Sequence, residues 1–413
     1  MSDSRPDPVG APVVRRDAPP AGPAGRHDDP AIGPVARRDD LAMVLDGGGA
    51  RAAYQVGLLR WLARRHPDLR VPMLTGVSAG AINAVYLAAH PGPFATAVDD
   101  LARLWSTLTV DKVFRVDTRS LLGNLWYWGL RLVSGGRILR PPMRGLVDTA
   151  PLHDTLRAAF GTDARGVVTG IERNLERGRL VGLAIITSSY TTGRTVAWVQ
   201  GRQIEDWERP FRHSRQCAIT LEHVMASAAL PMLFPAVRLD RAWYGDGGIR
   251  LITPLSPAIH LGANRLLAFS TRYPRSREEA EHPQVDGYPP PMQIAGQLLN
   301  AIFLDDHDRD ALTLRRINML LRDLPPREHH GLRLLDLVVV RPSRDIGRLA
   351  AEFEPQLPGL FRHLLRSAGA RETRSPDLLS LLMFEPDYVR RVMDIGEADA
   401  EAMGASIEAL ITG

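Results

Sequence analysis

The stretch LAMVLDGGGARAAYQVGLLRWL, Leu41–Leu62, decides the fold. Its first five residues are apolar and predict a buried strand, and the apolar residues in its second half recur at helical spacing. Between the expected strand and the expected helix lie Asp46 and the glycines Gly47, Gly48 and Gly49. Such a turn exposes backbone N–H groups at a helix N-terminus, where partial positive charge accumulates. The turn therefore predicts a site for a negative group, either a bound phosphate or an oxyanion formed during a reaction.

The pattern of strand followed by helix continues along the chain. Near-continuously apolar strands separated by helices indicate a mostly parallel sheet with helices on both faces. Strands are expected at residues 41–45, 71–77, 180–187, 195–199, 265–270 and 334–340, and helices at 50–62, 79–89, 219–229 and 291–322. The predicted fold class is therefore a three-layer α/β/α architecture with a mostly parallel central sheet.

A second motif follows the second expected strand. Gly76, Ser78 and Gly80 form a G-x-S-x-G pattern between a strand and a helix rich in small residues. This is the context of a nucleophile elbow, in which the flanking glycines permit a strained turn that exposes the serine hydroxyl. Because parallel strands place their carboxyl ends at one edge of a sheet, we expect the glycine turn and Ser78 to share a crevice. The turn would then serve as an oxyanion hole.

A serine nucleophile needs a base. None of the histidines that follow Ser78 lies in a glycine-rich setting that would fix it at a reacting centre; these are His90, His153, His213, His223 and His260. Asp246 lies in such a setting, because it follows a short aromatic run and precedes Gly247 and Gly248. An aspartate has an ordinary pKa of about 3.9, so this role requires burial or a close hydrogen bond.

Taken together, these motifs resemble those of the patatin-like phospholipase family. The glycine-rich motif stands at residues 46–52, G-x-S-x-G at 76–80, an A-S-x-A-x-P-x-x-F-P block at 226–235 and Asp-Gly-Gly at 246–248, in the order that the family has. The similarity covers residues 41–254. One departure is Ala52, where the family usually has glycine.

The resemblance implies a catalytic dyad of Ser78 and Asp246 that acts on fatty-acyl esters without a histidine. It also implies an oxyanion hole formed by Gly47, Gly48 and Gly49. We expect supporting roles for the residues that flank these groups, which are Asp46, Arg51, Gly76, Gly80, Gly247 and Gly248. Arg51 has two interpretations. It has a functional role, in which it braces the glycine turn or attracts a phosphate head group, or it is simply an exposed arginine on a surface turn.

Three other functions compete with this one. A dinucleotide-binding turn is disfavoured because the second strand lacks the acidic residue that this fingerprint requires, and because Asp46 would repel a pyrophosphate. An α/β-hydrolase with a Ser-Asp-His triad could use His260. The third is a catalytically silent lipid-binding or scaffolding protein of the same fold, and the presence of all the expected catalytic residues argues against it. Between a phospholipid and a lysophospholipid substrate, and between hydrolysis and acyl transfer, the motifs do not decide.

Three regions organise the chain. Residues 1–40 are rich in Pro, Ala, Gly, Arg and Asp without hydrophobic periodicity, which is typical of a disordered tail. Residues 41–345 form the expected catalytic domain. Residues 346–413 carry apolar stripes at helical spacing and predict helices that cover this domain.

An aromatic segment interrupts the alternation at residues 121–139. It contains Trp126, Tyr127 and Trp128 among leucines at helical spacing. It forms either a helix packed on the core or an interfacial helix that presents these aromatic side chains to lipid.

Composition limits the functions further. A net charge of +4 over 413 residues gives no nucleic-acid footprint, and a single cysteine excludes an intramolecular disulfide framework. No segment has the ~18 apolar residues of a membrane span or the apolar core of a secretory signal. We therefore expect a cytoplasmic protein with peripheral contact with the membrane surface, a lipid ester as its partner, and no cofactor or metal. The oligomeric state stays open.

Overall fold

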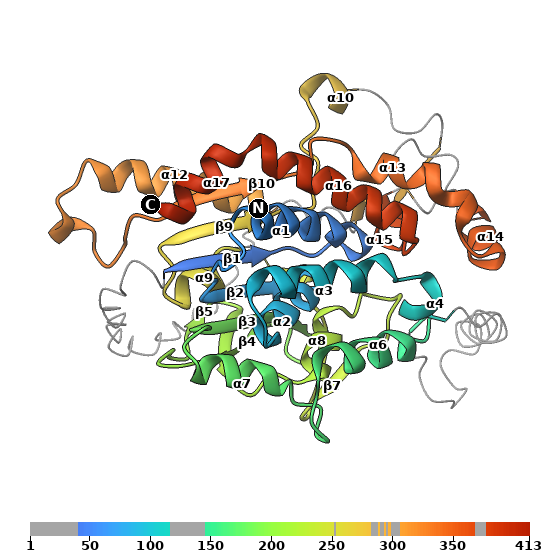
Figure 1. The fold of residues 1–413 in the computed structure, drawn as a ribbon, viewed down its shortest axis with the longest axis horizontal. Coiled ribbons are helices and arrows are strands. Elements are labelled where there is room, and N and C mark those ends of the chain that lie inside the picture. Colours follow the sequence, from blue (N-terminus) through green and yellow to red (C-terminus); the bar gives the residue numbers. More distant parts are fainter. Residues whose placement is uncertain are drawn as a thin grey trace, which may run out of the picture. The chain divides into compact units, whose positions relative to one another are not determined.

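The glycine turn lies beside the central strands of a sheet (Figure 1). The computed structural model describes residues 40–115, 145–251, 253–281, 288–289, 293–294, 296–298, 306–367 and 377–413. The predicted tail up to residue 39 and the aromatic segment with Trp126, Tyr127 and Trp128 lie outside these residues.

Five parallel strands form the centre of the sheet, in the order β10, β9, β1, β2, β3. Their bounds are β1 (Leu41–Leu45), β2 (Met73–Val77), β3 (Gly182–Ser189), β9 (Arg265–Phe269) and β10 (Asp336–Val340). The sheet continues beyond β3 with strands β4 (Thr195–Gly201), β5 (Glu208–Arg209), β6 (Arg212–Gln216), β7 (Val237–Leu239) and β8 (Ala242–Asp246). Here β4 and β6 pair in parallel, and the other pairs are antiparallel. The predicted mostly parallel sheet is thus confirmed.

The two faces of the sheet bury separate apolar clusters, because successive side chains of a strand point to opposite faces. Leu41, Met43 and Leu45 of β1 belong to the larger cluster, whereas Ala42 and Val44 belong to the smaller one. The larger cluster includes residues of α1 (Ala53–Arg65), α2 (Ala79–Ala89), α3 (Phe94–Ser106), α4 (Val110–Val113), α6 (Ala150–Phe160), α7 (Thr169–Glu176) and α8 (Leu221–Ser227). The smaller cluster includes residues of α9 (Ser256–His260) and α12 (Asp306–Arg322).

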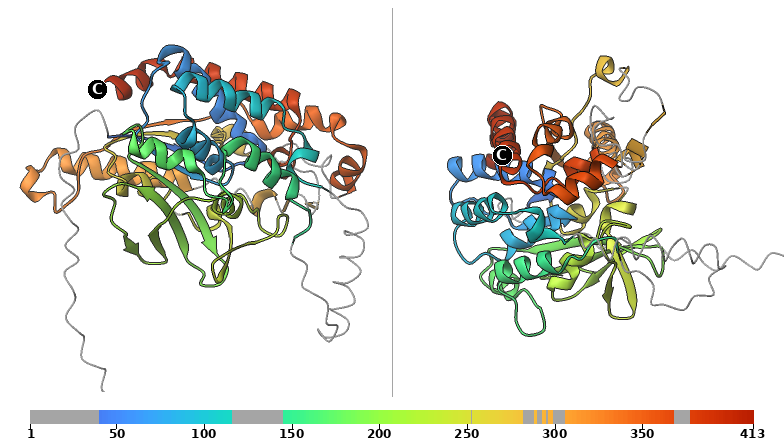
Figure 2. Two further views of the ribbon diagram at one scale, coloured as in Figure 1. Left: turned by 60° about the horizontal axis from the view of Figure 1, so that its bottom comes forward. Right: turned by 90° about the vertical axis from the view of Figure 1, so that its right-hand side faces the viewer.

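The C-terminal helices follow β10, and α16 (Pro386–Ala402) among them packs directly on α1. They are α13 (Ile346–Phe353), α14 (Gly359–Ser367), α15 (Asp377–Leu381), α16 (Pro386–Ala402) and α17 (Gly404–Thr412). Glycines let α1 and α16 approach closely, since a Cβ on Gly57 would collide with the Met393 carbonyl and a Cβ on Gly396 with the Tyr54 carbonyl. Tyr54 donates a buried hydrogen bond of 2.9 Å to Asp399. Figure 2 shows α16, in red, running alongside the blue α1.

Several predicted boundaries are wrong by about two residues. The strands expected from residues 71, 180 and 334 begin at Met73, Gly182 and Asp336. Pro72 precedes the first of these and has no N–H for a ladder hydrogen bond. The helix expected over residues 219–229 is shorter, at Leu221–Ser227, because Thr220 caps its start.

Candidate active site

The ends of β2 and β8 meet along one edge of β3. The other edge of β3 pairs with β4. On the first edge Val77, the last residue of β2, pairs with Ile186, and Asp246, the last residue of β8, pairs with Thr187. Because Ile186 and Thr187 are consecutive, the two strands approach each other end to end. This arrangement brings Ser78 and Asp246 together from positions 168 residues apart in the sequence.

Ser78 lies on a strained turn between β2 and α2. Its φ of 56° is in the left-handed region, which is uncommon for a residue with a side chain. The turn is held by Ser227, whose hydroxyl accepts a hydrogen bond from the Ser78 amide at 3.0 Å and donates one to the Ile186 carbonyl at 2.7 Å. These bonds fix the direction of the serine.

Gly76 and Gly80 flank the turn and allow the backbone to pack tightly. A Cβ on Gly80 would collide with the carbonyl oxygens of Leu45 and Asp46, so the start of α2 lies directly against the end of β1. A Cβ on Gly76 would meet the Gly80 carbonyl. The two glycines of the motif therefore bring the serine turn to the glycine turn of residues 47–49.

Asp246 is fully buried at the end of β8. Its Oδ1 accepts a hydrogen bond of 2.9 Å from the Gly248 amide, and its Oδ2 accepts none of ordinary length from the described residues. Burial raises the pKa of Asp246 from 3.8 to about 7, although hydrogen bonding by the nearby Ser78 hydroxyl and by the Gly248 amide lowers it. Gly247 packs against the Ile186 carbonyl. The carboxyl group thus titrates near neutral pH beside a serine.

The glycine turn packs on the same serine. A Cβ on Gly47 would lie 3.0 Å from the Ser78 Cβ, and the Gly48 and Gly49 backbones have positive φ angles of 142° and 53°. Within the described part of the chain, the amides of these three glycines donate no hydrogen bond. The turn thus offers free N–H donors next to a hydroxyl.

Two side chains hold the glycine turn from behind. The Thr271 hydroxyl donates a hydrogen bond of 2.7 Å to the Gly47 carbonyl. The Gln55 amide donates one of 2.7 Å to the carbonyl of Asp46, whose side chain is buried. The position of the turn is therefore fixed by α1 and by the segment that follows β9.

Arg51 is buried and connects the turn to the C-terminal helices. Its guanidinium donates to the Asp377 carboxylate at 2.8 Å and to the Ser380 hydroxyl at 2.6 Å, both on α15. The Leu381 carbonyl of the same helix lies so close to Gly49 that no Cβ would fit there. The interpretation of Arg51 as an exposed surface arginine is wrong, and its buried ion pair leaves it unavailable to a head group. The sequence gives no sign of Asp377 and Ser380 as its partners.

An apolar cavity opens beside Ser78. The residues that line it come from the glycine turn, α2, α3, α4, α6, the block after α8 and the segment before α16: Gly49, Ser78, Ala79, Ile82, Leu104, Trp105, Leu108, Val113, Leu152, Thr155, Leu156, Ala228, Leu230, Phe234 and Phe384. Almost all of them are hydrophobic. Phe384 was not predicted, since no local pattern connects it with residues 300 positions earlier.

Histidines lie elsewhere. His260 stacks on Trp207 with ring centroids 4.4 Å apart. His223 is buried, contacts Thr220 and Cys217, and has a pKa lowered to about 4 by burial. Among the described residues, no histidine forms a hydrogen bond with Ser78 or Asp246. The geometry therefore does not support a Ser-Asp-His triad.

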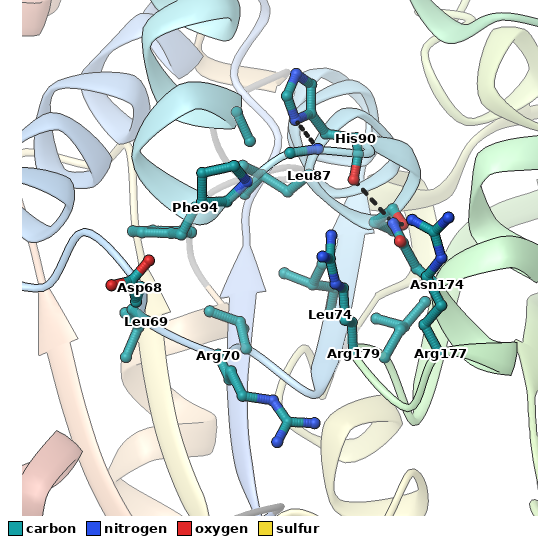
Figure 3. A pocket seen from close by; sticks show the side chains of 16 residues that line it. Asp68, Leu69, Arg70, Leu74, Leu87, His90, Phe94, Asn174, Arg177 and Arg179 are labelled. Atoms are coloured by element: carbon teal, nitrogen blue, oxygen red, sulfur yellow. Dashed lines mark hydrogen bonds between the residues drawn. The ribbon is translucent and has the colours of Figure 1, made fainter.

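A larger cavity of about 420 Å³ lies at the amino-terminal ends of β2 and β3 (Figure 3). The segments that precede β2 and β3 line it, with Arg70, Arg177 and Arg179 at its rim, and the Asn174 side chain donates a hydrogen bond of 2.9 Å to the His90 carbonyl. None of the predicted site residues contributes to this cavity.

The described residues offer neither a metal-binding cluster nor a membrane-spanning helix. No group of three or more His, Cys, Asp or Glu side chains is placed to hold a metal ion in that part of the chain. No helix among the same residues is both long and apolar enough to cross a membrane.

Comparisons with known proteins place the motifs in a family. A sequence model described as patatin-like phospholipase matches residues 43–259, more than half of the chain. No curated protein sequence matches.

Solved structures resemble the chain only distantly. Human GIVD cytosolic phospholipase A2 is 13% identical with a TM-score of 0.42, covering 91% of this chain and 61% of its own. VipD from Legionella pneumophila is 13% identical with a TM-score of 0.34, covering 84% and 67%. ExoU of Pseudomonas aeruginosa, in complex with SpcU, is 18% identical with a TM-score of 0.25, covering 83% and 74%. Because these scores lie below 0.5, the assignment rests on the sequence model.

Proposed function

The chain belongs to the patatin-like phospholipase family, and on that premise we propose that it is a serine acyl hydrolase of phospholipids or lysophospholipids that uses a Ser78–Asp246 dyad. Family membership supports hydrolysis of lipid esters. The observation that carries the finer proposal is the meeting of Ser78, a buried carboxyl group and free glycine amides beside one apolar cavity.

In the first step, the Ser78 Oγ attacks the carbonyl carbon of the acyl ester. Its proton passes to the Asp246 carboxylate, and a tetrahedral intermediate forms. This intermediate collapses when the Asp246 carboxylic acid returns the proton to the departing alcohol oxygen. The products are an alcohol, such as a lysophospholipid, and an acyl ester on Ser78.

The second step reverses these roles with water. Asp246 accepts a proton from a water molecule whose oxygen attacks the acyl-enzyme carbonyl. The Ser78 oxygen then leaves and is reprotonated by Asp246. A fatty acid is released, and both side chains return to their first state.

The pKa of Asp246 supports its role in both steps. A general base is most effective when its pKa lies near the working pH, and burial brings the pKa of Asp246 to about 7. An exposed aspartate, with a pKa near 4, would accept the serine proton far less readily. The environment of this carboxyl therefore removes the need for a histidine.

The glycine turn supports the stabilisation of the negative oxygen in both tetrahedral intermediates. Among the described residues the amides of Gly47, Gly48 and Gly49 donate to no acceptor, and Gly47 contacts Ser78. Fixed donors in a site without water stabilise such an oxygen strongly, and losing one typically costs ~100- to 1000-fold in kcat.

The apolar cavity supports a fatty-acyl substrate. It is lined by leucine, isoleucine and aromatic side chains and begins at Ser78, so an acyl chain placed there would bring its carbonyl to the nucleophile. Of the described residues that line it, Ser78 and Thr155 carry hydroxyl groups.

Direct product analysis tests this function. Purified wild type and Ser78→Ala would be incubated with a phospholipid and with its lysophospholipid, and released fatty acid measured by mass spectrometry. We expect release by the wild type alone. Binding of the lipid without release by either protein would favour the silent lipid-binding alternative, and acyl transfer to an added alcohol without free acid would identify a transferase.

A further inference from the structure

Four large hydrophobic side chains project into solvent at the edge of the sheet that carries the catalytic groups. Met232 is 84% exposed, Phe211 75%, Tyr190 49% and Trp243 40%. Exposed apolar side chains gathered at one site mark binding surfaces more often than scattered ones do. The first question is whether these four belong to one site.

Strand pairing places three of them together. Tyr190 follows the end of β3, and its amide donates a hydrogen bond of 2.8 Å to the Trp243 carbonyl at the start of β8. Phe211 precedes β6, and its carbonyl accepts a bond of 2.9 Å from Thr195, the first residue of β4. Thr195 in turn pairs with Ser188 of β3. All three residues thus lie where β3 ends, just beyond Asp246.

The fourth residue lies in a block whose buried residues line the cavity. Met232 sits between Leu230 and Phe234, and both of these neighbours line the cavity beside Ser78. The Ala229 carbonyl, in the same block, accepts a hydrogen bond of 3.0 Å from the Asp246 amide. The Met232 backbone has a φ of 66°, and its side chain points away from the buried neighbours into solvent. The block that contacts the Asp246 backbone and lines the cavity therefore also exposes a flexible apolar side chain.

Tyr190 gives independent evidence of this proximity. Its ring lies directly over Gly245, where a Cβ would meet the ring carbons at 2.5 Å. Burial and the negative charge of Asp246 raise the pKa of its hydroxyl. Tyr190 thus lies close enough to Asp246 to feel its charge.

Positive charges accompany these side chains. Arg238 and Arg241 lie in the β7–β8 hairpin, and Arg250 follows β8; all three are exposed. Within the described residues the guanidinium groups of Arg238 and Arg250 bond only to backbone carbonyls, and none of the three forms an ion pair. Aromatic side chains beside arginines are suited to a membrane interface, where the rings enter the head-group layer and the cations meet phosphate.

We propose that Tyr190, Phe211, Met232 and Trp243 form a docking rim that inserts into the surface of an anionic lipid layer, with Arg238, Arg241 and Arg250 contacting the head groups. The proposal rests on the proposed function in one respect, which is that the rim would deliver an acyl chain to the cavity beside Ser78. It assigns membrane contact to residues other than the aromatic segment of residues 121–139.

Vesicle sedimentation tests the rim. Every protein in the experiment carries Ser78→Ala, so that no lipid is hydrolysed during the measurement. The test variant is Phe211→Gln, Met232→Gln, Trp243→Gln. Its matched control is Leu312→Gln, Met319→Gln, Leu320→Gln, which removes three exposed apolar side chains from α12. On vesicles of phosphatidylcholine with phosphatidylserine, we expect the rim variant to lose about tenfold or more in partition and the control to change by less than about twofold.

Charge is tested with the same vesicles. Replacing Arg238, Arg241 and Arg250 by glutamine should weaken binding to vesicles with phosphatidylserine by about fivefold per arginine and leave binding to pure phosphatidylcholine unchanged. Circular dichroism melts of each variant would establish that it is folded.

Three results would overturn the proposal. Equal losses in the rim variant and the α12 control would mean that the rim has no special role, and so would unchanged vesicle binding by a folded rim variant. A wild type that is dimeric without lipid, with a monomeric rim variant, would assign these side chains to self-association. None of these results depends on turnover. Failure of the proposed function would appear in a different measurement, as absence of fatty-acid release by the wild type.

Discussion

Arg51 and Asp377 form an ion pair 2.8 Å long whose side chains are 4% and 12% exposed, and it joins the glycine turn to a helix 326 residues away. Breaking a buried pair leaves an uncompensated charge, which typically costs 3–5 kcal/mol. Asp377→Asn should therefore lower the free energy of unfolding by roughly 3 kcal/mol and reduce kcat more than it raises KM, because the turn loses its support.

An exposed pair provides the control for this prediction. Arg390 and Asp387 are both more than half exposed, and pairs of this kind contribute about 0–1 kcal/mol. Urea unfolding of Asp377→Asn and Asp387→Asn would compare the two directly. Equal effects would show that the buried pair does not support the turn.

The buried carboxyl of Asp246 should make stability depend on pH. Its pKa is about 7 in the folded protein and near 3.8 when exposed, so between these values the unfolded state loses a proton that the folded state keeps. Stability contributed by the neutral form is present below about pH 4 and lost as the pH rises through about 7. Asp246→Asn removes this loss.

Asp246→Asn should therefore match the wild type in stability near pH 4 and exceed it by up to about 4 kcal/mol above pH 7. The asparagine keeps an oxygen for the Gly248 amide. Urea unfolding at several pH values would measure the difference. A variant that is less stable than the wild type at pH 8 would contradict the destabilising burial of this carboxylate.

The same titration should control the rate. The base must be ionised, so kcat/KM for a soluble ester should rise with pH and level off above about pH 7. No histidine that contacts the dyad is present in the described residues, so His260→Gln should leave this profile in place. A profile that shifts with His260→Gln would revive the triad.

Phe384 should help to select the acyl chain, since it lines the cavity beside Ser78. Phe384→Leu enlarges this space and should raise the ratio of kcat/KM for long over short p-nitrophenyl esters by roughly tenfold. Phe353→Leu is the matched control, because Phe353 packs on Tyr388 and does not line the cavity. A shift of equal size in both variants would argue against an acyl-chain pocket.

Local patterns were sufficient to predict the central strands and the motif turns. The apolar run of β1 and the glycines that follow it specify one strand–turn–helix unit, and the α/β class with a mostly parallel sheet is confirmed. The predicted helix over residues 79–89 agrees with α2. The catalytic roles of Ser78 and Asp246, and the division of the chain at residue 345, stay predictions.

Contacts between distant segments escaped prediction for a physical reason. The end-to-end meeting of β2 and β8 depends on which edge of β3 each strand occupies. The sequence of β8, Ala242–Asp246, is short and does not specify that edge. Asp377, Ser380 and Phe384 reach the site only because α15 and the chain that follows it pack against the glycine turn. No periodicity in the sequence reports such packing.

Labelling of the nucleophile tests the central claim most directly. A fluorophosphonate forms a covalent bond with an activated serine, and peptide mass spectrometry identifies the residue that carries it. We predict one modified peptide, containing Ser78, in the wild type and in Ser270→Ala, a buried serine at the same edge of the sheet, and none in Ser78→Ala. Undiminished labelling and ester turnover by Ser78→Ala would contradict the account.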